Sequence, residues 1–229
     1  MASPESDAGL SNSFTDLMTS LAVIFILLLC ASLNNAQQEG ENIRNNILAE
    51  LQKELREFVV KGMEVKPDPK DPLGLLILVP EGLLQFELDK ADIPEKGIDF
   101  LRLFIPKLAK IACSEKYKKE INSIVVEGHT DSSGTDQHNW ELSQKRSMSV
   151  VKDSLYVLTE NQNHGEDAIT ARNYFLRFLS ASGRGSAELV RGPCGKENCA
   201  LSRRVIFKIR VRSLEQKPLV ELLGVSLGR

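Results

Sequence analysis

One stretch of the chain is continuously apolar, and the rest mixes apolar and polar positions. The apolar stretch covers residues 14–33, which as an α-helix would be roughly 30 Å long, the thickness of one hydrocarbon core. No other stretch approaches this length. The pattern predicts a single transmembrane helix, residues 14–33, after a short polar tail, residues 1–13, that is too short to fold by itself.

The next segment, residues 34–72, begins with a polar stretch in which apolar residues recur at every third or fourth position from Ile43 to Phe58. Such spacing places these residues on one face of a helix. Two interpretations stay open: the helix lies on its own domain, or it is a stalk or plug that pairs with a second copy. Three prolines between residues 66 and 72 then predict a stiff linker. The apolar positions are Ile43, Ile47, Leu51, Leu55 and Phe58.

Residues 73–212 have the length and pattern of one compact domain, followed by an unassigned tail, residues 213–229. Strand-like and helix-like segments alternate in it, which predicts an α/β sandwich with a small mixed sheet and helices on one face. We expect a hairpin of residues 75–79 and 83–86, strands at 121–127 and 203–211, and helices at 94–113, 139–158 and 167–179.

Composition and charge exclude some classes of protein. The 229 residues carry a net charge of −2 without a basic block, so nucleic acid is not expected as a direct ligand. The first basic residue is Arg44, whereas a secretory signal has a positive segment before its apolar run. Leu29 precedes Cys30, where lipoprotein processing needs a small residue. The apolar run is therefore interpreted as an uncleaved anchor.

The cysteines and histidines offer little chemistry. Cys194 and Cys199 enclose four residues that include a glycine, a spacing that suits a tight disulfide in an oxidising compartment. A metal site there would lack a second pair of ligands. The three histidines are scattered, and no serine has the partners of a nucleophile. We expect neither a metal site nor an enzyme.

Asp16 is a carboxylate just inside the apolar run. Inserting such a charge into the membrane raises the free energy of a helix by about 2.5–3.5 kcal/mol. An acidic side chain that is kept there normally faces a partner or a water path and carries ions. Thr19 and Ser20 lie one turn further along and could hydrogen-bond the neutral or ion-loaded acid. The alternatives are that Asp16 reaches interfacial water, and that Thr19 and Ser20 are small residues for helix packing. Asp16, Thr19 and Ser20 are the candidate ion-translocating residues.

A second candidate site joins the end of the strand at 121–127 to the following helix. Asp131 follows that strand, and Asn139, Ser143 and Arg146 share one face of the helix. A carboxylate beside a guanidinium suits a ligand that has both an ammonium and a carboxylate, which arginine binds through two parallel hydrogen bonds. The alternative is that Asp131 and Arg146 only pair with each other at the surface.

These residues closely resemble the OmpA-like peptidoglycan-binding domain, over roughly residues 75–212. The resemblance implies that Asp131 and Arg146 hold the diaminopimelate residue of the peptide stem, with Thr130, Asn139 and Arg204 around it. It also implies a periplasmic domain, and hence a cytoplasmic N-terminus. Ser202 departs from the family, which usually has Asn there. The matching residues are Gly128, His129, Thr130, Asp131, Asn139, Leu142, Ser143, Arg146, Ser202, Arg203, Arg204 and Val205.

The N-terminal half adds a second resemblance. An aromatic residue two positions before Asp16, and a Met-Thr pair after it, open a single apolar helix that leads through a linker to an OmpA-like domain. This order resembles the B subunits of flagellar-type stators, and among them those of Zorya anti-phage defence systems. There, the acid matching Asp16 binds the translocated ion, and two B helices sit inside a ring of five A subunits.

The resemblance implies a peptidoglycan-anchored stator subunit in the bacterial inner membrane. It would be a homodimer within a pentameric ring of multi-span A subunits, and it would act in anti-phage defence. The transported ion would be a proton, with sodium as the other possibility, and no cofactor is implied. The alternatives are a flagellar motility stator and a passive tether between membrane and wall.

Overall fold

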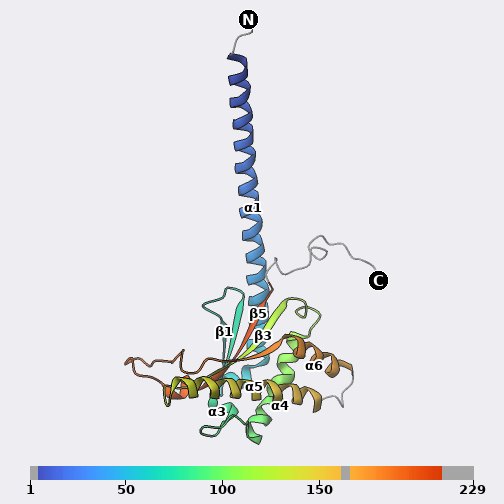
Figure 1. The fold of residues 1–229 in the computed structure, drawn as a ribbon. Helices are drawn as coiled ribbons and strands as arrows, with labels where there is room; N and C mark the ends of the chain where they lie inside the picture. The colour runs from blue at the N-terminus through green and yellow to red at the C-terminus, as the bar shows by residue number, and fades with distance from the viewer. Residues whose placement is uncertain (1–4, 161–165, 213–229) are drawn as a thin grey trace.

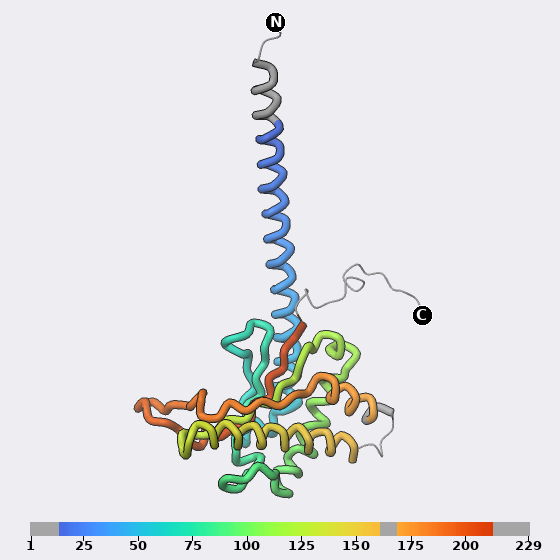
Figure 2. The backbone as a smooth tube through the Cα atoms, in the orientation of Figure 1, coloured from blue at the N-terminus to red at the C-terminus, as the bar shows by residue number. Residues whose placement is uncertain are grey.

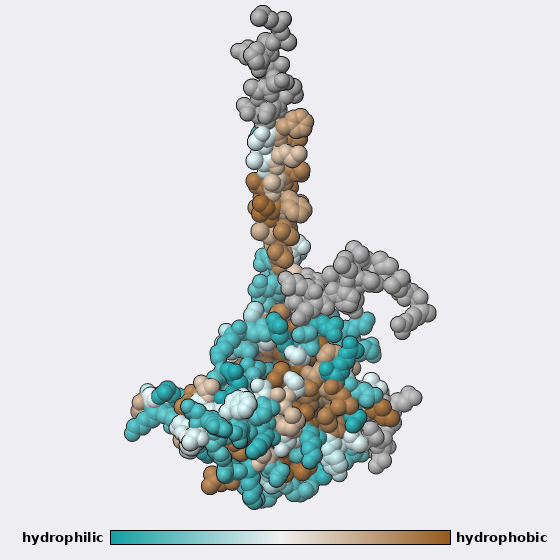
Figure 3. Space-filling view, viewed as in Figure 1, coloured by the Kyte–Doolittle hydropathy of each residue, from teal (hydrophilic) through white to brown (hydrophobic). Residues whose placement is uncertain are grey.

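The computed structural model describes residues 5–160 and 166–212, with side chains for residues 14–160 and 169–212. One long helix, α1 (Glu5–Glu54), stands on a compact α/β domain (Figure 1). The large apolar side chains from Phe14 to Leu33 are 49–67% exposed, and they form the brown band of the shaft in Figure 3. Within the described residues, this is the one helix long and apolar enough to cross a membrane.

Helix α1 is continuous where the sequence predicted three separate segments. It begins at Glu5, so the prediction of an unfolded tail is wrong for residues 5–13. Its last turns enter the domain, where Ile47, Leu51 and Leu55 are fully buried, and Phe58 of α2 (Arg56–Val59) is 1% exposed. The apolar stripe therefore packs on its own domain, and the packed core begins before the predicted boundary at residue 73.

The domain is built on a five-stranded mixed sheet with the order β1-β2-β5-β3-β4. Strands β3 and β4 are parallel, and the other neighbours are antiparallel. The predicted α/β class is confirmed. The strands are β1 (Glu64–Pro67), β2 (Gly74–Pro80), β3 (Ile121–His129), β4 (Leu179–Gly183) and β5 (Arg204–Val211). The helices after α2 are α3 (Glu81–Leu84), α4 (Glu95–Ala112), α5 (Asp136–Glu160), α6 (Glu166–Phe178) and α7 (Cys199–Ser202).

One face of the sheet forms the core, because alternate strand residues point toward the helices. Ile77 of β2 and Phe207 of β5 are fully buried in one cluster with residues of α1, α4, α5 and α6. The ring of Phe207 lies 5.1 Å from that of Phe104 in α4. On the opposite face, Lys208 pairs with Glu127 at 3.2 Å. Arg210 of β5 likewise pairs with Asp71, at 2.8 Å.

Two predictions between α1 and α4 are wrong. The proline-rich segment is not a linker, because residues 64–67 form the edge strand β1, and an edge strand tolerates a proline at its end. Residues 83–86 are not the second strand of a hairpin, because β2 leads directly into α3. Strand β2 instead pairs with β1 and β5, which places it inside the sheet.

The two ends of the sheet have different neighbours. At the end where β5 finishes, the Val211 amide donates to the Leu73 carbonyl, and a Cβ on Gly40 of α1 would lie 2.7 Å from the Leu73 side chain. Helix α1 therefore passes close to this end, as Figure 2 shows. The other end of β5, at Arg204, lies about 23 Å away at roughly 3.3 Å per residue. The candidate site lies at that second end.

Candidate functional site

Strand register brings three distant residues to one end of the sheet. Pro80 of β2 and His129 of β3 are both paired with Arg204 of β5. The residue after β2 is Glu81, the residue before β5 is Arg203, and Asp131 follows β3 by two positions. These three side chains therefore converge, although Glu81 and Arg203 are 122 positions apart in the chain.

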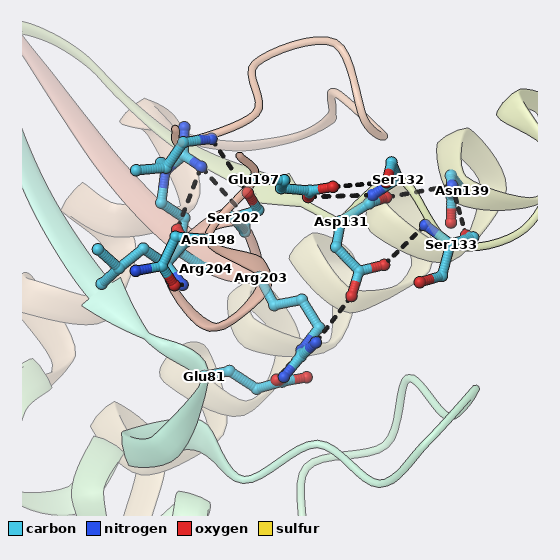
Figure 4. A network of polar contacts seen from close by, with 12 residues as sticks. Glu81, Asp131, Ser132, Ser133, Asn139, Glu197, Asn198, Ser202, Arg203 and Arg204 are labelled. Carbon is cyan, nitrogen blue, oxygen red and sulfur yellow. Dashed lines mark hydrogen bonds and ion pairs between the residues drawn. The ribbon is translucent and has the colours of Figure 1, made fainter. Parts of the chain in front are cut away.

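Four side chains of alternating charge cross the floor of this region. Arg203 Nη1 donates to Asp131 Oδ2 at 2.7 Å, and Arg203 Nε donates to Glu81. Arg146 Nη1 lies 3.4 Å from the other Glu81 oxygen. Figure 4 shows Arg203 reaching between the two carboxylates. Asp131 and Arg146 are thus linked through Glu81 and Arg203, so the alternative in which they only pair with each other is wrong.

Arg146 is a buried cation whose hydrogen bonds are mostly in use. Its side chain is 7% exposed. Its Nε donates to the Lys90 carbonyl at 2.9 Å, and its Nη2 donates to the Glu87 carbonyl at 3.2 Å. The guanidinium also lies 4.9 Å from the centre of the Phe86 ring, a cation–π distance. The edge that could bind a carboxylate through two bonds is therefore occupied by the loop between α3 and α4.

Asp131 is held as a carboxylate by its neighbours. Burial alone would raise the pKa of Asp131, but hydrogen bonds from Arg203 and from the Ser133 amide outweigh it and hold that pKa below its ordinary value. The turn itself is fixed by Asn139, whose amide nitrogen donates to the Asp131 and Ser133 carbonyls at 3.3 and 2.8 Å. Asn139 therefore positions the turn that carries Asp131.

The four charged residues line an open cleft of about 670 Å³. We call it the charged cleft. Arg203 is its more accessible cation, because its side chain is 36% exposed compared with 7% for Arg146. A zwitterionic ligand would find carboxylates for its ammonium and a guanidinium for its carboxylate here. The polar members of the lining are Glu81, Asp89, Thr130, Asp131, Ser133, His138, Asn139, Arg146 and Arg203.

The other residues predicted for this site differ in their positions. Thr130 lines the cleft but is 3% exposed, and its amide donates to the Gly185 carbonyl at 3.0 Å. Arg204 does not line the cleft; it donates to the Glu188 and Ser202 carbonyls. The prediction that Arg204 binds ligand is therefore not supported by its position. Glu81 was not predicted from the sequence, and Arg203 was predicted only as part of a motif.

Close packing of α5 on the sheet sets the geometry of the cleft. A Cβ on Gly128 would lie 2.3 Å from the Ser143 carbonyl oxygen, and one on Gly183 would lie 2.5 Å from the Gln144 amide nitrogen. Only glycine allows so close an approach of helix to strand. The Ser143 hydroxyl in turn accepts from the Gly185 amide at 2.9 Å. These contacts fix Arg146 of α5 relative to Asp131.

The predicted disulfide is not formed. Cys194 and Cys199 are both exposed and free. The segment between them is closed by backbone hydrogen bonds, such as Gly192 N to Lys196 O at 2.8 Å, so it needs no covalent bond. It is also tied to the cleft, because Glu197 accepts hydrogen bonds from the amide and hydroxyl of Ser132 (Figure 4).

No metal or catalytic arrangement appears among the described side chains. They contain no group of three or more His, Cys, Asp and Glu residues that could hold a metal ion. His129, at the end of β3, is 2% exposed. Burial lowers the pKa of His129, which outweighs the opposing effect of Glu127. His129 is therefore a neutral residue of the interior.

The predicted ion site lies far from this cleft, in the exposed part of α1. Asp16 is exposed there, and at about 1.5 Å per residue it lies roughly 36 Å along the helix from Gly40. The Thr19 hydroxyl donates to the Thr15 and Asp16 carbonyls at 2.6 and 3.0 Å. Thr19 thus bonds the helix backbone in this structure. The role of Asp16, Thr19 and Ser20 stays a prediction.

The chain is similar in sequence to one protein family and to two known proteins. Residues 85–161 match the model of the OmpA family. The chain is 23% identical over 205 residues to the Zorya protein ZorB of the Crooks strain of Escherichia coli, over 86% of each chain. It is 28% identical over 214 residues to ZorB of an ETEC strain, over 90% of this chain and 81% of the relative.

The fold has a counterpart among solved structures. The crystal structure of a MotB-like protein from Desulfovibrio vulgaris superposes with a TM-score of 0.53 at 22% identity. The alignment covers 77% of this chain and 99% of that protein. The likeness at this level of identity is one of fold.

Proposed function

We propose that this chain, a MotB/OmpA-like protein related to ZorB, is a wall-anchored stator B subunit of an ion-driven membrane motor. One observation carries the proposal: a membrane-length apolar helix containing Asp16 continues without a break into the domain that carries the charged cleft. An acid in a membrane helix suits ion transfer, and the cleft suits an anchor. A motor needs both.

The anchoring part of the proposal rests on the chemistry of the charged cleft. A peptidoglycan stem peptide with a diamino acid presents an ammonium and a carboxylate on one residue. Asp131 and Glu81 would take the ammonium, and Arg203 would take the carboxylate because it is the exposed guanidinium. Arg146 would act mainly by holding the loop wall and balancing the charge of Glu81.

The proposed orientation is supported by where α1 joins the domain. Helix α1 passes the end of the sheet opposite to the charged cleft, so a membrane around residues 14–33 leaves the cleft facing away from it. This arrangement suits a bacterial inner-membrane protein with a cytoplasmic N-terminus and a periplasmic cleft that reaches the wall. The relatives named ZorB favour a role in anti-phage defence over flagellar motility.

The motor part of the proposal assigns the ion to Asp16. Protonation would neutralise the carboxylate and change its favoured position among neighbouring helices, and sodium is the alternative ion. The partners would be multi-span A subunits in a ring of five around two copies of this chain. Because α1 enters the domain core at Ile47 and Leu51, a force acting near Asp16 would reach the wall site without passing through a flexible linker.

The ion site is tested by Asp16→Asn, with Glu41→Gln on the same helix as the matched control. We expect the Asp16 variant to lose phage protection in cells while it still co-purifies with the A subunit, because only the titratable group is removed. The control should keep full protection. Full protection by the Asp16 variant would refute the ion-driven motor. The protein would then act as a passive tether, which needs the cleft but no ion site.

The anchor is tested by co-sedimentation of the full chain in detergent with purified peptidoglycan. We expect Asp131→Ala combined with Arg146→Ala to stay in the supernatant. Because Arg146 is buried, Asp131→Asn serves as a milder variant that keeps the shape of the side chain and should also bind less. Asp99→Asn, on the exposed side of α4, is the control. Unchanged co-sedimentation of both cleft variants with peptidoglycan would refute the proposed anchoring role of the cleft.

A further inference from the structure

The charged cleft continues beyond a side-chain contact that crosses it. His138 Nε2, in the first turns of α5, lies 2.6 Å from Asp89 Oδ1 of the loop between α3 and α4. A second hollow of about 260 Å³ shares Asp89, His138 and Leu142 with the charged cleft. It adds Ala91, Glu141 and Lys145 to the lining. We call this second hollow the side groove.

The side groove offers one uncommitted cation. Glu141 and Lys145 are four positions apart on α5 and therefore lie on the same side of the helix. Glu141 accepts a hydrogen bond from Gln137 at 3.0 Å. Lys145 is exposed, and none of the ion pairs between described residues includes its ammonium. The groove thus presents the Lys145 ammonium beside the apolar side chain of Leu142, with the carboxylates of Asp89 and Glu141 also in its lining.

The size and position of the side groove suit part of a ligand. Its volume of about 260 Å³ is below the roughly 300 Å³ at which pockets for whole small molecules begin. A peptide bound in the charged cleft by one residue must leave it in some direction. The side groove offers one such direction, because it adjoins the charged cleft at Asp89, His138 and Leu142 and is lined further on by Lys145.

We propose that the side groove is a second binding subsite, which takes a free carboxylate on the peptide residue next to the diamino acid through Lys145. The inference rests on the proposed peptidoglycan binding and deepens it, because it names the part of the ligand that distinguishes a stem peptide from a free diamino acid. Lys145 acts as a point charge at an exposed position, so it contributes to specificity more than to total affinity.

The test is calorimetric titration of the full chain in detergent with two probes. One probe is free meso-diaminopimelate, and the other is a stem tripeptide that carries a free carboxylate on the residue before the diamino acid. We expect Lys145→Ala to weaken tripeptide binding about two- to fivefold, the range of an exposed ion pair, and Lys145→Glu to weaken it further. Binding of free diaminopimelate should not change. Lys152→Ala, an exposed lysine of α5 outside the groove, is the matched control.

Two results would refute the proposal that the side groove is a second subsite. Equal tripeptide affinity for Lys145→Ala and the unchanged chain would show that Lys145 takes no carboxylate. A parallel loss for both probes would show that the side groove is not a separate site. Failure of the unchanged chain to bind either probe would instead refute the proposed anchoring, and the subsite with it. Selective loss of tripeptide binding supports both.

Discussion

Arg203 connects the two carboxylates of the charged cleft, and its replacement by alanine tests whether this connection stabilises the domain. The change removes the donor at 2.7 Å from Asp131 Oδ2 and the donor to Glu81. Asp131 keeps the hydrogen bond from the Ser133 amide at 3.0 Å. Two carboxylates, 12% and 20% exposed, then face each other without the cation between them.

The magnitude follows from the number and burial of the lost bonds. A hydrogen bond to a charged group contributes about 1.5–3 kcal/mol when it is buried. The Arg203 side chain is 36% exposed, and solvent reduces the contribution of exposed pairs to about 0–1 kcal/mol. We therefore expect Arg203→Ala to lower the free energy of unfolding by about 1–2 kcal/mol. For a domain of this size, that corresponds to a fall in Tm of about 2–8 °C.

The effect should depend on pH with a definite sign. The pKa of Asp131 is held below its ordinary value in the folded state, so its pairing stabilises the domain above about pH 4. That contribution is lost as the pH falls through the folded-state pKa. In Arg203→Ala, the loss of the guanidinium lets burial raise the pKa of Asp131. The difference in stability between the two proteins should be largest at neutral pH and shrink below about pH 4.

The assay is thermal unfolding of the full chain in detergent between pH 3 and pH 7. Arg203→Lys serves as a second variant, because it keeps the charge but lacks the fork that reaches both carboxylates, and it should give an intermediate Tm. Equal Tm values for Arg203→Ala and the unchanged protein at pH 7 would refute the reasoning. So would a constant difference across the whole pH range, because it would show that Asp131 does not titrate with the pair.

Two further predictions concern packing, and both are measured by thermal unfolding. Leu51→Ala should lower the free energy of unfolding by about 2–5 kcal/mol, because Leu51 of α1 is fully buried in the domain core. The control is Val60→Ala at an 86% exposed position, which should change that free energy by less than about 0.5 kcal/mol. Equal changes for the two variants would show that α1 is not docked on the domain. Gly128→Ala should lower the free energy of unfolding by about 1–3 kcal/mol, because its Cβ would lie 2.3 Å from the Ser143 carbonyl oxygen. The same variant should co-sediment less with peptidoglycan. The control is Gly82→Ala, because no atom lies within 4 Å of a Cβ at that position. A Gly128 variant as stable as this control would contradict the close packing of α5 on the sheet.

Short-range patterns were predictable because they depend on neighbours in the sequence. The length of the apolar run indicated a membrane helix, and the stripe from Ile43 to Phe58 indicated an amphipathic helix. The motif near Asp131 and the helix face of Arg146 indicated that both residues lie close together, and both line the charged cleft. Short apolar runs were less reliable: residues 83–86 suggested a strand, since four residues cannot distinguish strand from helix.

The periodic elements, the α/β class and the chemical types at the two ends of the molecule could be predicted from the order of residues, because periodicity is a local property of the chain. Three features became visible only in the folded chain: α1 is one continuous helix docked by Leu51, residues 64–67 are an edge strand, and Glu81 and Arg203 stand between Asp131 and Arg146. The meeting of Glu81 with Arg203 depends instead on the antiparallel register of β2 and β5, which no local pattern encodes.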